Sequence, residues 1–143
     1  MKIISFEGIE GVGKSTQIDL LHDYLLNAGK SVKKFREPGS TIPSEKIRNI
    51  LLDANLTLTS QTELLLMYAS RSELVANEIL SSQHDFILLD RYFDVSMAYQ
   101  GYGRNLNKHF INSLKTFINA PDPNLTILLD LSLIHISEPT RQP

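Results

Sequence analysis

The segment from residue 8 to residue 15 constrains the fold of this chain more than any other feature. Its sequence, Gly-Ile-Glu-Gly-Val-Gly-Lys-Ser, fits the pattern G-x-x-x-x-G-K-[ST] without a mismatch. An apolar run precedes it and a stretch with helical spacing follows it, which is the setting in which such a loop surrounds phosphate groups. Glycines let the loop turn its backbone N–H groups inward, and the helix adds the positive end of its dipole. The motif predicts a nucleoside triphosphate site.

Two side chains of this loop have specific expected roles. Lys14 is long enough to reach the β- and γ-phosphates, and the hydroxyl of Ser15 is a ligand for Mg²⁺. The alternative is a glycine-rich turn that matches the pattern by chance, and the flanking strand and helix argue against it. The residues expected around the triphosphate are Gly8, Ile9, Glu10, Gly11, Val12, Gly13, Lys14, Ser15 and Thr16.

Strands and helices are predicted to alternate along the chain. Apolar runs indicate strands at residues 2–6, 31–35, 86–90 and 126–130. Helical spacing indicates helices at 15–28, 43–52, 60–82 and 108–119, with another beginning near 96–99. A capping-box pattern, Ser60 to Glu63, opens the longest of them. Such an order predicts an α/β fold in three layers, with a parallel sheet flanked by helices on both faces.

Composition and charge exclude several classes of function. The net charge of −2 disfavours nucleic acid as a partner, although it allows a small phosphorylated ligand. The absence of cysteine removes disulfides, thiolate zinc sites and a cysteine nucleophile. No apolar run approaches the ~20 residues needed to span a bilayer, and the first apolar run is too short for a signal peptide. We therefore expect a cytoplasmic enzyme with no membrane partner.

Functional side chains are expected at the carboxyl edge of the sheet, where ligands gather in parallel α/β folds. Gly8, Arg36, Asp90 and Asp130 all follow or end apolar strands, so they should converge there. Asp90 has the position of a Walker-B acid, which holds Mg²⁺ together with the loop hydroxyl. The alternative for Asp90 is a strand-end residue that caps the next segment.

Two arginines are expected near the same loop. Arg36 ends the second predicted strand, and Arg91 directly follows Asp90. A guanidinium group presents a planar fork that binds phosphate through two hydrogen bonds, so the pair suggests a second, acceptor phosphate. Either arginine alone is more often a partner in a surface ion pair.

A third arginine lies in the middle of the longest predicted helix. Arg71 is four residues after Met67 and so shares its face of the helix, with Tyr68 beside them. A flat apolar side chain next to an arginine can hold a base by its face and its edge. The alternative is that Met67 and Tyr68 belong to the core and Arg71 pairs with Glu63 or Glu78.

Four segments, taken in order, resemble thymidylate kinase. They are residues 6–17 (FEGIEGVGKSTQ), 36–39 (REPG), 90–92 (DRY) and 96–101 (SMAYQG). The resemblance implies the core of a P-loop nucleoside monophosphate kinase that transfers the γ-phosphoryl group of ATP to dTMP, giving dTDP, with Mg²⁺ held by Ser15 and Asp90. It also implies that family members form homodimers.

The resemblance also implies roles for single residues. Glu10 would lie near the sugar 3′-hydroxyl, and Tyr99 would crowd the sugar C2′ and disfavour ribose. Either Met67 or Tyr68 would stack on the base. The residues implied to bind dTMP are Glu10, Arg36, Met67, Tyr68, Arg71, Arg91, Ser96, Tyr99 and Gln100, and those implied to assist the transfer are Lys14, Asp90 and Arg91.

Two features depart from the full family pattern. Some members place an arginine where this loop has Gly11, and the other subtype, which this chain resembles, has a cationic lid later in the sequence. We expect the kinase core to span residues 1–130 and the lid to be missing, with Arg104 as a weaker candidate for its role. Residues 131–143 resemble a translated sequencing adaptor, and we expect them to pack poorly; the alternative is a genuine divergent terminus.

Three other functions stay open at this point. Another nucleoside monophosphate kinase would share the core, and a nucleotide-binding fragment without the lid would bind nucleotide with little turnover. A regulatory GTPase is disfavoured, because residues 107–110 read Asn-Lys-His-Phe where that class requires N-K-x-D.

Overall fold

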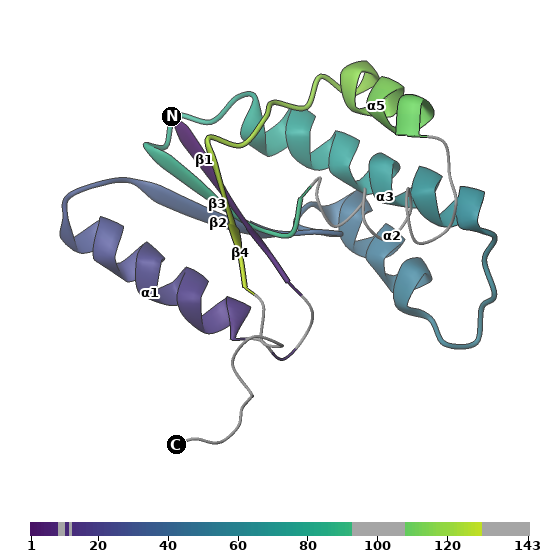
Figure 1. Cartoon of the computed structure of the whole chain (residues 1–143), viewed down its shortest axis with the longest axis horizontal. Coiled ribbons are helices and arrows are strands. Elements are labelled where there is room, and N and C mark those ends of the chain that lie inside the picture. The colour runs from purple at the N-terminus through teal and green to yellow at the C-terminus, as the bar shows by residue number, and fades with distance from the viewer. Residues whose placement is uncertain (9–10, 12, 93–107, 130–143) are drawn as a thin grey trace.

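The structure is a computed structural model of the chain, and it describes residues 1–8, 11, 13–92 and 108–129. Over these residues, strands and helices alternate as the sequence predicts (Figure 1). The elements in chain order are β1 (Lys2–Glu7), α1 (Lys14–Asn27), β2 (Val32–Arg36), α2 (Ile42–Leu52), α3 (Ser60–Leu74), the π-helix η1 (Val75–Ile79), β3 (Phe86–Asp90), α5 (Lys108–Phe117) and β4 (Leu125–Leu128).

The four described strands form one parallel sheet in the order β2-β3-β1-β4. The first strand therefore lies inside the sheet, between β3 and β4. Register places Phe6 beside Asp90, and Arg36 beside Asp90 on the other side. The strand ends that precede functional residues thus lie level with one another, which confirms the predicted α/β class.

Each face of the sheet carries its own apolar core, because neighbouring residues of a strand point to opposite faces. Ile3, Ile87 and Leu89 pack with residues of α3 and η1, whereas Ile4 and Leu88 pack with α1. Figure 1 shows α1 on one side of the sheet and α2, α3 and α5 on the other. A smaller cluster joins α3 to α5. The strand sequences are apolar at successive positions because both faces are covered.

The longest predicted helix begins where the sequence predicts but has a different N-cap and a shorter regular α-helical part. It begins at Ser60 as expected, but its N-cap is Thr59, whose hydroxyl accepts a hydrogen bond from Thr62 N at 3.1 Å. Its regular α-helical part ends at Leu74 and continues as η1, where Leu80 N donates to Val75 O five residues earlier. A π-helical turn contains about one residue more than an α-helical turn, and the sequence pattern did not predict it.

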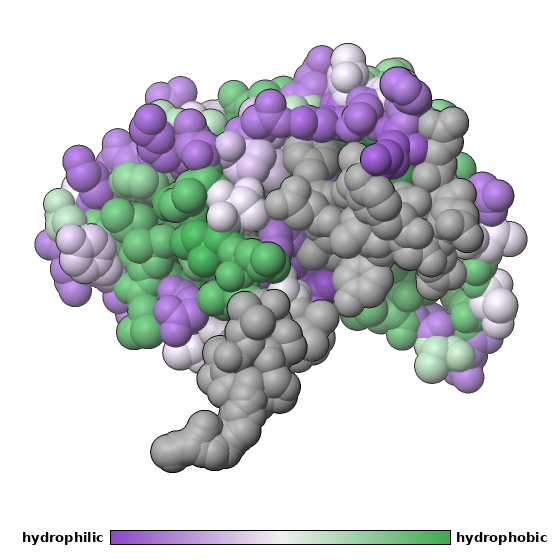
Figure 2. All heavy atoms as spheres, viewed as in Figure 1, coloured by the Kyte–Doolittle hydropathy of each residue, from purple (hydrophilic) through white to green (hydrophobic). Residues whose placement is uncertain are grey.

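Apolar side chains are also exposed on one face of the molecule. Figure 2 shows them gathered over α1 and the neighbouring strands, with polar side chains along the rim above. Leu20 on α1 and Leu125 and Leu128 on β4 are among the exposed apolar residues.

Three sequence-based predictions lie outside the described residues: the helix near residues 96–99, Asp130 and the tail at 131–143.

Candidate active site

Backbone hydrogen bonds hold the carboxyl ends of the three neighbouring strands β2, β3 and β1 together. Arg91 N donates to Phe6 O at 2.9 Å, and Glu37 N donates to Asp90 O at 2.9 Å. These bonds continue the ladders just beyond the last paired residues of β1, β3 and β2. As a result, Gly8, Arg36 and Asp90 lie at one edge of the sheet, where the sequence predicts them.

The lysine of the phosphate-loop motif is held by two acceptors at this edge. Lys14 Nζ lies 3.2 Å from Asp90 Oδ1 and donates a hydrogen bond to Gly8 O at 3.2 Å. Lys14 is only 6% exposed, whereas the Asp90 side chain keeps 26% of its surface open. The ammonium group therefore lies between the carbonyl oxygen of Gly8 and the strand-end acid Asp90. Gly13, which precedes Lys14, has a φ of 83°, a left-handed conformation that glycine adopts without steric cost.

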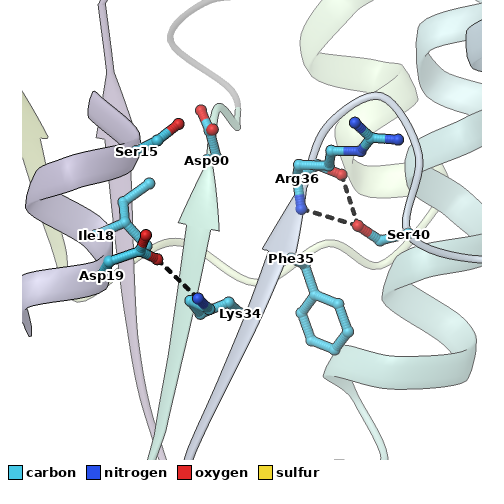
Figure 3. A pocket seen from close by; sticks show the side chains of 8 residues that line it. All are labelled: Ser15, Ile18, Asp19, Lys34, Phe35, Arg36, Ser40 and Asp90. Atoms are coloured by element: carbon cyan, nitrogen blue, oxygen red, sulfur yellow. Dashed lines mark hydrogen bonds and ion pairs between the residues drawn. The ribbon is translucent and has the colours of Figure 1, made fainter. Parts of the chain in front are cut away.

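A pocket of about 250 Å³ opens beside this ion pair. Figure 3 shows Ser15 at the start of α1 and Asp90 at the end of β3, with their oxygen atoms directed toward the same opening. Arg36 and Ser40 line it from the side of β2. Its other lining residues are Ile18, Asp19, Lys34 and Phe35.

The donor atoms at the mouth of this pocket fit the Mg²⁺ that the sequence predicts. Ser15 offers a hydroxyl and Asp90 a carboxylate, both oxygen ligands of the kind that Mg²⁺ prefers. Within the described part of the chain, no three His, Cys, Asp or Glu side chains gather into a metal cage. Few protein ligands are expected for a cation that keeps several waters and binds beside substrate phosphates.

Arg36 is exposed and lies in a small hydrogen-bonded loop. Its Nη2 donates to Glu45 Oε1 at 2.7 Å, and its backbone N donates to Ser40 Oγ at 2.8 Å. The other oxygen of Glu45 accepts from Ser40 N at 2.7 Å. The Ser40 N–H, followed by Arg36, holds the pKa of Glu45 below its ordinary value. Glu45 therefore stays ionised at neutral pH and orients a guanidinium that is 53% exposed.

Arg71 is buried and its carboxylate partner is Glu37. The alternative drawn from the sequence, in which Arg71 pairs with Glu63 or Glu78, named the wrong partners. Arg71 Nε lies 2.6 Å from Glu37 Oε1, and Nη2 donates to Tyr92 O at 3.0 Å. Burial raises the pKa of Glu37, while Arg71 acts against that rise. The guanidinium also lies 5.0 Å from the ring centre of Tyr68. Arg71 thus connects α3 to the ends of β2 and β3 beneath the site.

The two candidates for stacking on a base differ in burial. Tyr68 is 3% exposed and packs with Leu64 and Ile111 in the cluster between α3 and α5. Met67 is partly exposed. The sequence alternative that placed Tyr68 in the core is therefore correct for that residue.

The sequence profile of the family described as "Thymidylate kinase" matches residues 6–138. The chain belongs to the thymidylate kinase family. It is 48% identical over 131 residues to a protein named thymidylate kinase from Thermosipho melanesiensis, and 46% identical over 132 residues to one from Prosthecochloris aestuarii. These alignments cover 90% of this chain but 65% and 59% of the two relatives, so the chain spans less than two thirds of their length.

A solved structure supports the same family at the level of the fold. The thymidylate kinase from Ehrlichia chaffeensis superposes with a TM-score of 0.83 at 37% identity. The match covers 90% of this chain and 72% of that one.

Several residues that the thymidylate kinase resemblance singles out lie outside the described residues. They are Ile9, Glu10, Val12, Ser96, Tyr99, Gln100 and Arg104. Among the helices that the structure does describe, none is both long and apolar enough to cross a membrane.

One buried residue at this edge was not assigned a role by the sequence. Glu7, the last residue of β1, is 2% exposed, and its Oε2 accepts a hydrogen bond from Tyr92 N at 2.8 Å. The signal available in the sequence was a carboxylate at the end of an otherwise apolar strand, directly before the phosphate loop. A buried carboxylate needs hydrogen-bond donors, and this position places it beside the end of β3.

Proposed function

We propose that this chain carries the nucleotide-binding core of an enzyme that transfers the γ-phosphoryl group of ATP to dTMP, giving dTDP. The observation that carries the proposal is the meeting of Lys14, Asp90 and Arg36 at one sheet edge, in a chain of the thymidylate kinase family. These residues offer a phosphate loop, a metal-holding acid and a cation on the acceptor side. A phosphoryl transfer requires such an arrangement.

The acceptor group needs little activation in this reaction. A phosphate monoester has its second pKa near ~6, so the attacking oxygen of dTMP is already mostly anionic at neutral pH. The obstacle is repulsion between two anionic groups, and catalysis is therefore a matter of cations and alignment. Lys14 binds the β- and γ-phosphates, and Arg36 and Arg91 bind the acceptor phosphate. Mg²⁺, held by Ser15 and Asp90, would neutralise charge on the ATP phosphates.

Base and sugar recognition are assigned to residues around α3 and to segments outside the described residues. Met67 is the better candidate for packing on the thymine, because Tyr68 is buried in the core. Arg71 would bond the base edge while its Nε and Nη2 remain with Glu37 and Tyr92. We assign Ser96 and Gln100 to the base, and Glu10 and Tyr99 to the sugar.

A turnover screen tests this proposal directly. ATP is supplied with dTMP, dUMP, dCMP or dGMP in turn, and dTMP binding is measured by calorimetry on the same preparation. We expect dTMP to be the preferred acceptor. A clear preference for the purine monophosphate would reject the assignment, and binding of dTMP without turnover would show a binding core that does not catalyse.

A matched pair of lysine variants controls the screen. Lys14→Met removes the ammonium group beside Asp90 and should lower turnover by at least about 10²-fold, the usual loss for a preorganised charge-stabilising group. Lys33→Met alters an exposed lysine on β2 and should leave turnover close to that of the parent. Equal rates in the two variants would remove Lys14 from the mechanism.

The family resemblance also suggests assembly and location. We propose a homodimer that acts in the cytoplasm, and sedimentation of the purified protein at several concentrations tests the first part.

A further inference from the structure

The backbone of Arg91 has an unusual conformation. Its φ is 75°, in the left-handed region that non-glycine residues seldom adopt. Such a residue persists only where its neighbours hold it, because the conformation is less stable than the common ones. Contacts of the neighbouring backbone must therefore hold Arg91 in this conformation.

The anchors on the side of the sheet come from the last two residues of β1. Arg91 N donates to Phe6 O at 2.9 Å, and Tyr92 N donates to Glu7 Oε2 at 2.8 Å. The first bond involves only backbone, so any sequence can make it. The second requires a side chain of the right length with an oxygen acceptor, which Glu7 provides.

The other anchors act on Tyr92 itself. Its carbonyl oxygen accepts from Arg71 Nη2 at 3.0 Å, and its hydroxyl donates to Pro121 O at 2.8 Å. Tyr92 has 0% of its surface exposed. Glu7 therefore binds the N–H of Tyr92, and Arg71 binds its carbonyl oxygen. Arg91 directly precedes this fixed residue in the chain.

The burial of Glu7 needs a reason, because a carboxylate loses stability when it leaves water. Alternation along β1 places Glu7 on the same face as Ile3 and Ser5, toward α3 and Tyr92. An apolar residue would fit this face at lower cost if packing were the only requirement. A hydrogen bond from a backbone N–H to a charged acceptor is stronger than one to a neutral acceptor, so a carboxylate holds the Tyr92 peptide firmly.

We propose that Glu7 is a positioning residue, whose carboxylate fixes the peptide of Tyr92 and thereby keeps Arg91 in its left-handed conformation for binding the acceptor phosphate. The inference rests on the proposed function for the role of Arg91. It adds a direct connection between the strand that enters the phosphate loop and the arginine on the acceptor side. Both phosphate subsites are then aligned by one residue.

The first experiment tests the anchor without any ligand. Amide hydrogen exchange of Tyr92 is measured by NMR in the parent chain, in Glu7→Gln, which keeps an acceptor oxygen, and in Glu7→Met, which removes it. We expect slow exchange in the parent and Glu7→Gln, and exchange at least about tenfold faster in Glu7→Met. Where Glu7→Met does not fold, Glu7→Asp, which withdraws the carboxylate by one methylene group, replaces it. Unchanged exchange in these shortened or apolar variants would overturn the proposal.

The second experiment separates positioning from general destabilisation. Binding of dTMP and of thymidine is measured by calorimetry, since only dTMP carries the phosphate that Arg91 would contact. We expect Glu7→Met to weaken dTMP binding by about tenfold with little change for thymidine, and Glu7→Gln to restore most of the loss. In an Arg91→Met background, Glu7→Met should cause no additional loss, because the two residues act through one contact.

A control in the same strand gives the merely structural outcome. Ser5→Ala removes a buried side chain's hydrogen bond to Thr126 Oγ1, 2.8 Å long, without touching Tyr92. It should lower stability and leave the ratio of dTMP to thymidine affinity unchanged. Equal losses for dTMP and thymidine in Glu7→Met, or losses that add to those of Arg91→Met, would refute the positioning role. Absence of dTMP binding in the parent would instead refute the proposed function, and the exchange experiment would still decide the anchor.

Discussion

Gly39 shows how backbone conformation and one neighbouring side chain can together restrict a position to glycine. Its φ is 130°, where side chains are strained, and a Cβ at this position would lie 2.3 Å from Glu45 Oε2. That carboxylate cannot withdraw freely, because Ser40 N and Arg36 Nη2 each hold one of its oxygens. Glycine is therefore required both by conformation and by space, in the loop that orients Arg36.

Substitution of Gly39 should be more destabilising than substitution of another glycine with positive φ. Gly39→Ala is expected to lower the free energy of unfolding by about 2–3 kcal/mol, since strain and contact both contribute. Gly29→Ala, where φ is 83° and nothing lies within 4 Å of the added carbon, should cost only about 1 kcal/mol. Urea denaturation followed by circular dichroism measures both. Equal losses in the two variants would mean that the Glu45 carboxylate yields without cost.

At the start of α3, the sequence pattern locates the N-terminal end of the helix correctly but misses the capping residue by one position. The pattern Ser60 to Glu63 predicts the beginning of the helix correctly, yet the hydroxyl that caps it belongs to Thr59. Threonine and serine stand side by side here, and both are good N-caps, so the pattern alone cannot choose between them. The distinction depends on which of the two has extended backbone geometry, and this is Thr59, with φ −68° and ψ 158°.

Alanine substitutions at the two positions should separate their roles. Thr59→Ala removes the acceptor for Thr62 N and should lower the free energy of unfolding by about 1 kcal/mol. Ser60→Ala lies inside the first turn, where alanine is a better helix former, and should be neutral or slightly stabilising. Thermal unfolding of the two variants provides the comparison. A larger loss at Ser60 would restore the capping box that the sequence suggests.

At the scale of the molecule, the sequence predicts those features of the fold that depend on the order of strands and helices along the chain. Alternating strands and helices imply a parallel sheet, and a parallel sheet brings Gly8, Arg36 and Asp90 to one edge. It does not predict partners that only the folded chain brings together. Glu37 lies 34 residues from Arg71, whereas Glu63 and Glu78 lie near it on the same predicted helix, so local spacing pointed to the wrong carboxylates.

The ion pair of Glu37 and Arg71 should be costly to break and less costly to replace. Arg71→Met leaves the Glu37 carboxylate buried beside an apolar side chain and is expected to lower the free energy of unfolding by about 3–5 kcal/mol. The double variant Glu37→Leu/Arg71→Met removes both charges and should recover much of that loss. Arg48→Met, which removes a donor to Pro38 O, is the matched control and should cost about 1 kcal/mol. Chemical denaturation of the four proteins tests this, and a double variant no more stable than Arg71→Met would contradict it.

The position of β1 inside the sheet also has a consequence for how the protein is made. β1 leaves the ribosome well before its hydrogen-bond partners at residues 86–90 and 125–128, and Ile3 N bonds to Asn124 Oδ1, 121 residues later. Contacts so distant in sequence form slowly, because a long stretch of chain must be ordered before they stabilise anything. During synthesis, β1 therefore has no strand partner until most of the described chain has emerged. Until then its apolar side chains are exposed, and chaperones that bind nascent chains would have to cover them.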